Sequence, residues 1–190
     1  MIALSAHNIS ADDETLVNQV AEGQIQSLGV LFDRYHLSVR RFLARMQIAP
    51  ADLDDLVQVT FLQVPRAAVR FEAGRSVKGW LFGLATMVVR RHRRTIGRLA
   101  RKMAALAREP LARAPRTPAE LLGEQESFQR ANRALAALAV KKREVFVMVI
   151  LEKLSGETVA QALGIPIGTV WTRLHHGRRE LKDLLAEDDL

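Results

Sequence analysis

Apolar residues recur at steps of three and four along most of this chain of 190 residues. Between residues 24 and 47 they form one stripe, made of Leu28, Leu31, Phe32, Tyr35, Val39, Phe42, Leu43 and Met46. That spacing puts them on one face of a helix, so it predicts a long amphipathic helix over 24–47. No pattern of alternating apolar and polar residues reaches four residues with turn signals around it, as a strand would. The sequence therefore predicts an all-α fold.

Two more helices are expected before residue 96. The first starts at Ala51 or Asp52, after Pro50, and its buried stripe consists of Leu53, Leu56, Val57, Thr60, Phe61 and Val64. Pro65 should kink or end this helix, because proline lacks an N–H and clashes with the preceding turn. A short loop over 71–76 then precedes a helix over 77–94. That helix is expected to bury Trp80, Leu81, Leu84 and Val88.

Residues 97–119 have the composition of a linker, with Pro110, Pro115 and Pro118 among Ala and Arg. Helical signals resume near Glu120 and continue to about Ala137, and a further helix is expected over 142–152. We therefore expect an N-terminal segment (1–23), a helical domain (24–96), a basic, proline-containing linker (97–119) and a second, smaller helical domain (120–190).

Positive charge is concentrated in the middle third of the chain. Residues 61–118 carry fourteen basic and two acidic side chains, whereas the segments on either side are both net negative. Such a block attracts polyanions by Coulomb attraction and counterion release. Nucleic acid is the leading interpretation, with a solvated helix face or an anionic membrane patch as the alternatives. The densest cluster comprises Arg90, Arg91, Arg93, Arg94, Arg98, Arg101 and Lys102.

The most specific local pattern is GETVAQALGIPIGTVWTRLHHGRRELKDLL, from Gly156. A short helix, a turn at Gly164 and a second helix with buried positions at steps of four, three and four (Val170, Leu174, Gly177, Leu181) have the spacing of a helix-turn-helix, placed at about 156–176. In that motif the second helix enters the major groove of DNA. Its outward side chains combine hydrogen-bond donors with cations. They are Thr169, Trp171, Thr172, Arg173, His175, His176, Arg178, Arg179 and Lys182.

Several classes of function are not expected. The chain has no cysteine, which excludes a disulfide scaffold, a cysteine nucleophile and thiolate zinc sites. His175 and His176 are adjacent on a helix and point about 100° apart, so they are poorly placed to share a metal ion. The longest apolar run, 145–151, is far short of the roughly 20 residues of a spanning helix. We expect a cytoplasmic protein that is no enzyme, holds no cofactor or metal and does not insert into membranes.

Two stretches of the chain resemble bacterial sigma factors of the extracytoplasmic-function (ECF) group. The first contains FDRYHLSVRRFLARM, DLDDLVQVTFLQV and GWLFGLATMVVRRHRR and resembles sigma domain 2, with the signature D-L-V-Q-x-x-F from Asp55 to Phe61. The second, from LAALAVKKREVF to the C-terminal pattern above, resembles sigma domain 4, with G-T-V-x-[ST]-R-L from Gly168 to Leu174. Together they cover most of 25–96 and 133–185.

The resemblance implies a role for each region in starting transcription. The β′ and β subunits of core RNA polymerase, promoter DNA and an anti-sigma factor are the implied partners. The β′ coiled coil would dock on Asp52, Asp55, Gln58, Val59 and Leu62. The −10 element, with a flipped base and the melted strand, would meet Arg75, Lys78, Arg90, Arg91, Arg93 and Arg94. The −35 element would be read by Thr169, Trp171, Thr172, Arg173, His175, His176, Arg178 and Arg179. The linker would thread toward the RNA exit path.

Some positions depart from the family pattern. Val59 stands where an acidic residue is usual, Pro65 where an aromatic one is, and Thr86 and Met87 where Arg and Asn are common. These departures keep two alternatives open. One is a sigma-like mimic that sequesters an anti-sigma factor, and the other is a helix-turn-helix regulator that acts without polymerase.

Overall fold

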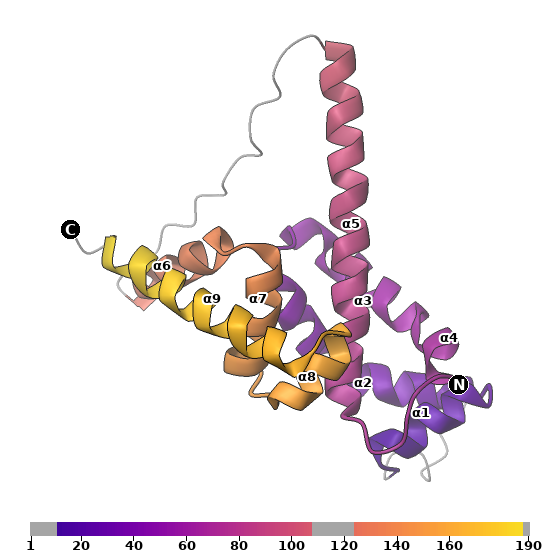
Figure 1. Ribbon diagram of the computed structural model, residues 1–190. Coiled ribbons are helices and arrows are strands. Elements are labelled where there is room, and N and C mark those ends of the chain that lie inside the picture. The colour runs from indigo at the N-terminus through magenta and orange to yellow at the C-terminus, as the bar shows by residue number, and fades with distance from the viewer. Residues whose placement is uncertain (1–10, 108–123, 188–190) are drawn as a thin grey trace.

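The computed structural model describes residues 11–107 and 124–187, and all of their regular structure is helical. The helices form two units (Figure 1), which confirms the predicted all-α, two-part architecture. The elements are α1 (Asp13–Ala21), α2 (Ile25–Arg45), a 3₁₀ turn (Pro50–Asp52), α3 (Leu53–Leu62), α4 (Val64–Ala68), α5 (Val77–Ala107), α6 (Glu124–Ala137), α7 (Val140–Phe146), a π-helical segment (Val147–Leu151), α8 (Gly156–Leu163) and α9 (Ile167–Glu187).

The N-terminal unit is built around α2, which packs against α1, α3 and α5. Two aromatic pairs mark its core. The rings of Phe42 and Phe82 stack with centroids 4.6 Å apart, and those of Phe32 and Phe61 meet edge to face at 4.9 Å. Because the α2 residues of these pairs belong to the predicted apolar stripe, they confirm the face of α2 that was expected to be buried.

The predictions for α3 are confirmed. All six residues of its expected stripe are buried, from Leu53 to Val64. The helix ends at Leu62, and Pro65 lies in the first turn of the separate short helix α4. Proline is tolerated there because the first N–H groups of a helix have no intrahelical partner.

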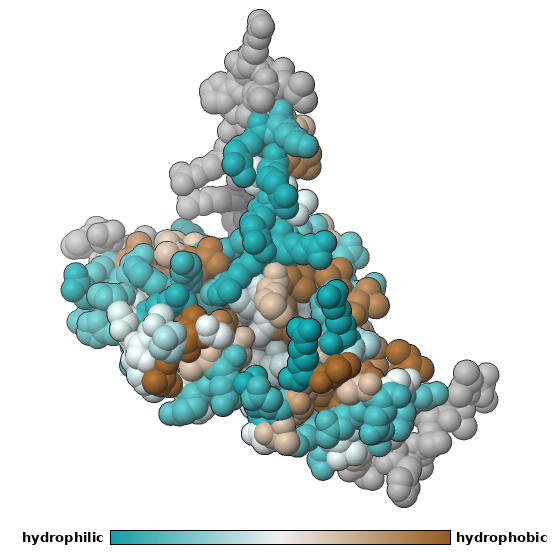
Figure 2. Space-filling model, turned by 45° about the vertical axis from the view of Figure 1, so that its right-hand side comes forward, coloured by the Kyte–Doolittle hydropathy of each residue, from teal (hydrophilic) through white to brown (hydrophobic). Residues whose placement is uncertain are grey.

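Helix α5 is longer than predicted. It was expected to end near Arg94 but continues to Ala107, so the first part of the expected linker is helical. Residues 95–107 are rich in Ala, Leu, Arg, Lys and Met, which favour helix, and contain no proline. The upper half of α5 stands out from the rest of the molecule (Figure 1). Hydrophilic side chains line much of the face that Figure 2 shows, and Ile96, Leu99 and Met103 on the same half are also exposed. The remainder of the expected linker, 108–119, lies outside the described residues.

Helix α1 was not predicted, because the segment 1–23 was left without assigned structure. Asp12 caps the helix by accepting a hydrogen bond from the Thr15 backbone N–H at 2.7 Å. Leu16 and Val17 are fully buried against the rest of the unit. The aspartate cap followed by apolar residues four and five positions later was the available signal. Residues 1–10 lie outside the described part of the chain.

The C-terminal unit contains the predicted helix-turn-helix. Ser155 caps α8, and Gly164 ends it in the left-handed region, with φ of 62°. Glycine adopts that conformation without the strain that a Cβ imposes. Val170, Leu174, Gly177 and Leu181 are all buried, as their spacing predicted.

The two units are in contact along α5. Helix α8 packs directly on it (Figure 1). The side chain of Arg90 on α5 donates to Glu144 on α7. Among the residues that the structure describes, none of the helices is both long enough and apolar enough to cross a lipid bilayer.

Candidate polymerase-binding and DNA-binding surfaces

The outer face of α3 combines acidic and apolar side chains. Asp55, Gln58, Val59 and Leu62 are exposed, and 71% of the Leu62 surface is accessible. Asp52 is half-buried, with its carboxylate 3.4 Å from the His92 ring. These are the five residues predicted to dock on polymerase, and the structure brings them onto α3 and the 3₁₀ turn that precedes it.

Two further exposed apolar residues belong to the same unit. Leu37 on α2 and Val69 after α4 are both more than half exposed. Sequence reasoning missed both. Leu37 lies off the apolar stripe of α2, and an apolar residue on the polar face of an amphipathic helix was the signal that could have found it.

The loop over 71–76 is held by carboxylates on two sides. The Gly74 N–H donates to Glu14 Oε2 at 3.0 Å, and Arg75 pairs with Glu72 at 2.7 Å. Gly74 has φ of 77°, a conformation suited to glycine. The carboxylate of Glu14 therefore ties the first turn of α1 to this loop.

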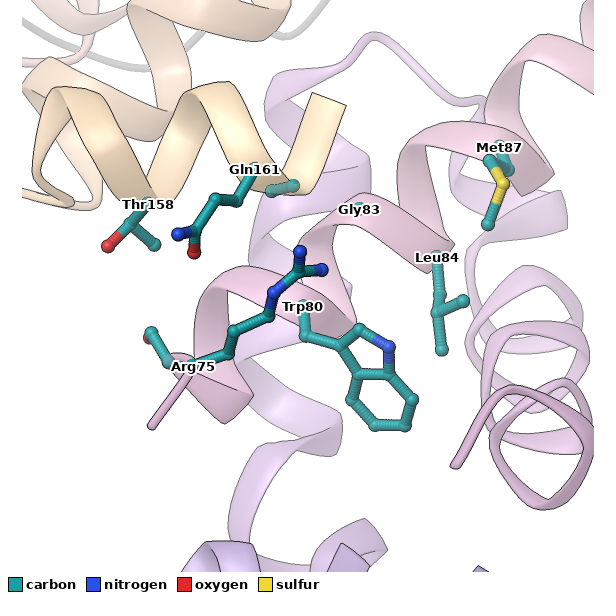
Figure 3. A pocket seen from close by; sticks show the side chains of 9 residues that line it. Arg75, Trp80, Gly83, Leu84, Met87, Thr158 and Gln161 are labelled. Carbon is teal, nitrogen blue, oxygen red and sulfur yellow. The ribbon is translucent and has the colours of Figure 1, made fainter. Parts of the chain in front are cut away.

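A small cavity of about 100 Å³ lies beside the loop, between α5 and α8 (Figure 3). Arg75 points into it, together with Trp80 of α5 and Gln161 of α8. The Nε of Arg75 is buried and has no hydrogen-bond partner among the described residues. Lys78, the other cation predicted for the −10 element at this end of α5, pairs with Glu152 at 2.9 Å.

The arginine cluster of α5 is divided between internal contacts and solvent. The guanidinium of Arg90 binds both oxygens of Glu144, at 2.8 and 2.6 Å, and these hydrogen bonds raise the pKa of Arg90. Arg93 donates to the backbone carbonyl of Met46 at 2.5 Å, and burial lowers its pKa. Arg91 and Arg94 are exposed. Two of the four predicted strand-contacting arginines are therefore accessible in this arrangement.

The second helix of the helix-turn-helix, α9, presents most of its predicted residues to solvent. Trp171, Thr172, His175, His176, Arg178 and Arg179 are exposed, while Thr169 and Arg173 are half-buried. The Trp171 ring lies against Gly156 at the start of α8, which leaves 49% of its surface accessible. Within the described segments, no group of three or more His, Cys, Asp or Glu side chains gathers as metal ligands would.

A buried arginine that sequence reasoning did not single out organises the C-terminal unit. Arg143 donates to the carbonyls of Leu135, Ala136 and Leu138 at the end of α6, and at 3.4 Å to Met46 of the N-terminal unit. Burial, with a smaller contribution from the nearby charge of Arg93, lowers the pKa of Arg143 to about 10. The planar fork of arginine suits several acceptors at once.

Taken together, these features define a two-unit, all-α helix-turn-helix protein with a basic helix running between its units. Comparisons with known proteins give its family. The model of sigma-70 region 2 matches residues 31–99, and that of sigma-70 region 4 matches residues 128–181. The chain belongs to the ECF family of RNA polymerase sigma factors.

The relatives cover most of the chain. The RNA polymerase sigma factor CarQ of Myxococcus xanthus is 33% identical over 166 residues, which are 84% of this chain and 90% of CarQ. The ECF sigma factor SigE of Mycolicibacterium smegmatis is 32% identical over 78% of this chain, and that match spans 58% of SigE.

Two solved structures share the fold of this chain, and each is 25% identical to it in sequence. CnrH, solved in complex with the cytosolic domain of CnrY, has a TM-score of 0.68 over 93% of this chain and 98% of CnrH. The sigma factor RpoE of Bartonella quintana, solved with the anti-sigma factor NepR, has a TM-score of 0.65 over 82% of this chain and 94% of RpoE.

Proposed function

We propose that this chain binds core RNA polymerase and directs it to promoters, as a promoter-specificity subunit that itself makes and breaks no bond. The observation that carries the proposal is the pairing of two outward surfaces in one chain. Helix α3 exposes Asp55 and Leu62, and α9, the second helix of the helix-turn-helix, exposes Trp171 and Arg178. An acidic and apolar face suits a protein partner, whereas a polar and cationic recognition helix suits DNA.

Each proposed contact has a place in the fold. The face of α3 would dock on the β′ coiled coil. The loop over 71–76 and the first turns of α5 would receive the −10 element, where extruding a base takes a few kcal/mol that a pocket must offset. The N-terminal half of α9 would read the −35 element. We assign 24–96 and 120–190 to the two domains, and a polymerase partner implies a cytoplasmic location.

The match to a sigma factor that was solved with an anti-sigma factor supports such a regulator as a further partner. RpoE of B. quintana was solved with the anti-sigma factor NepR bound, and CnrH with the cytosolic domain of CnrY bound. This chain resembles both over more than four fifths of its length.

In vitro transcription tests the proposal. The purified chain would be mixed with bacterial core polymerase and fragmented genomic DNA, and the 5′ ends of the transcripts sequenced. Discrete starts that share two upstream motifs are expected. If a control sigma factor is active and this folded chain yields no starts above core enzyme alone, the proposal fails. Binding of an anti-sigma factor without transcripts would then favour a mimic, and specific duplex binding without polymerase a simple regulator.

A further inference from the structure

Two exposed apolar side chains lie next to each other at the start of α9, the second helix of the helix-turn-helix. Ile167 is 40% exposed and Trp171 is 49% exposed. They are four residues apart, so they are neighbours on one side of the helix. Both lie over Gly156 of α8, where an added Cβ would be 2.5 Å from the Trp171 ring and 3.1 Å from Cδ1 of Ile167. We call Ile167 and Trp171 the apolar patch.

The start of α8 supports the apolar patch from below. Because Gly156 has no side chain, the indole ring of Trp171 can lie against the backbone there. Ser155 fixes this end of α8 by accepting a hydrogen bond from the Thr158 N–H at 3.1 Å. A side chain that is already held in place loses little conformational freedom when a ligand covers its exposed half. The patch is therefore preorganised for contact.

The side of α9 that carries Trp171 continues into exposed cations. Arg178 and Lys182 follow Trp171 by seven and eleven residues, so at 100° per residue all three lie within about 20° of one line along the helix. Both cations are exposed, and a rise of 1.5 Å per residue places them roughly 10 and 16 Å beyond Trp171. An apolar patch followed by cations suits a polyanion that also offers an apolar group, which is what DNA presents.

The apolar group that the major groove offers is the C5-methyl group of thymine. In a helix-turn-helix, the N-terminal residues of the second helix are the ones that contact base edges, and the patch lies in the first turns of α9. Next to the ring, the Thr172 hydroxyl donates to the Gly168 carbonyl at 2.9 Å, so its hydrogen is occupied within the helix. The carbon surface of the patch therefore has one matching group in the groove.

We propose that Ile167 and Trp171 read the C5-methyl group of a thymine in the −35 element. This inference rests on the proposed function, because it names the feature of the base that α9 recognises at that site. Thymine is then favoured at this position over cytosine, and also over uracil. Uracil has the same hydrogen-bonding edge as thymine but lacks the methyl group, so it isolates the apolar contact.

Uracil substitution tests the inference on the full chain bound to core polymerase. Promoters mapped by in vitro transcription supply the −35 element, and each of its thymines, on either strand, is replaced by uracil in a separate synthetic template. Competition between the thymine and uracil templates gives their relative affinity. We expect uracil to lower affinity about fourfold at one position or at two neighbouring ones, the effect of losing one buried methyl group. Uracil in the spacer between the two elements is the control and should have no effect.

Variants of the patch connect the methyl group to these side chains. Trp171→Ala should abolish the preference for thymine over uracil at that position, and Trp171→Phe, which keeps an apolar ring, should retain part of it. Ile167→Ala should reduce the preference while the ring stays in place. His176→Ala is the control, because His176 is exposed about 140° around the helix from Trp171, and the preference should persist. Each variant is compared with itself on two templates, so a smaller folded fraction cancels in the ratio.

The two proposals fail in different ways. If transcription starts at discrete sites but uracil is tolerated at every thymine of the −35 element, methyl reading is contradicted and the proposed function stands. The same holds if the preference for thymine persists in Trp171→Ala, since another residue then reads the methyl group. If no transcripts start above core enzyme alone, both proposals fail, because there is no −35 element for the patch to read.

Discussion

The indole ring of Trp171, on α9, lies over the α-carbon of Gly156, at the start of the preceding helix α8. A Cβ built at Gly156 would lie 2.5 Å from Cζ2 of Trp171. Only a residue without a side chain permits this packing. The contact fixes how the exposed tryptophan is presented beside Arg173 and Thr172.

Replacing Gly156 with alanine should therefore destabilise the C-terminal unit. The added methyl group must push the Trp171 ring aside, and overpacking of this kind typically costs about 1–3 kcal/mol. Urea unfolding monitored by tryptophan fluorescence measures the change. Gly168→Ala is the matched control, since a Cβ at Gly168 meets nothing within 4 Å and stability should be unchanged or slightly raised. Equal effects of both substitutions would contradict the packing argument.

Replacing Leu62 with aspartate should weaken binding to core polymerase. Leu62 is among the most exposed large apolar residues, so its surface is available to a partner and its loss should leave the free energy of unfolding within about 0.5 kcal/mol. If it is an interface anchor, affinity for core enzyme should fall about tenfold or more. Ile25→Asp is the control, because Ile25 is similarly exposed at the start of α2 but is not part of the α3 face. Matching losses in both variants would remove α3 as the docking face.

Replacing Arg173 with alanine should weaken use of the −35 element. Arg173 lies in the N-terminal half of α9, and loss of one base-contacting arginine costs about 1–3 kcal/mol and relaxes preference at one position. The measurement is transcription from a mapped promoter, with its own and with a mutated −35 element. Lys182→Ala, farther along α9, should leave the ratio between the two templates unchanged. An unchanged ratio for Arg173→Ala would exclude that residue from base reading.

The Asp12 cap should make the stability of α1 depend on acid pH. The hydrogen bond from the Thr15 N–H lowers the pKa of Asp12 below its ordinary value. A carboxyl whose pKa is lower in the folded state stabilises the fold when ionised, so this contribution is complete above about pH 5 and is lost as pH falls through the folded pKa. Asp12→Asn should keep the cap but lose this pH dependence, whereas Asp12→Ala should lower the Tm at neutral pH.

Thermal unfolding of the three proteins from about pH 7 to about pH 2 provides the comparison. Because Leu16 and Val17 are fully buried, loosening of α1 exposes core residues and should be visible in the Tm. Identical pH profiles for the unmodified chain and Asp12→Asn would show that the carboxylate charge at this cap has no effect.

Elements with strong periodicity could be predicted from sequence, and long-range pairing could not. The stripes of α2, α3 and α9 identify both the helix and its buried face, because a period of 3.6 residues has few other interpretations. The predicted end of α5 was wrong, because prolines from residue 110 onward made the whole stretch 97–119 resemble a linker. The part of that stretch up to Ala107 contains only helix-favouring residues and one glycine.

The candidate site shows the same limit. Arg90 and Lys78 were chosen because they lie in the most basic part of the chain, and the local pattern contains no sign of their partners. Those partners lie 54 and 74 residues away, in a different unit. Local charge thus indicates which kind of group a side chain can bind, but tertiary packing determines which group it binds in the folded chain.

The π-helical segment between Glu144 and Glu152 determines where the two carboxylates point. In a continuous α-helix, residues eight positions apart differ in direction by roughly 80°. The π-helical turn contains one residue more than an α-helical turn, as the hydrogen bond from the Glu152 N–H to the Val147 carbonyl shows. The extra residue changes the angle between the directions of the two side chains by roughly 100° in the opposite sense. Both side chains are thereby brought to the side of the helix that meets the N-terminal unit. The helical register of residues 147–151 thus sets the spacing of the two carboxylates. Deleting one residue from this segment should move the carboxylates away from their cationic partners without altering either glutamate.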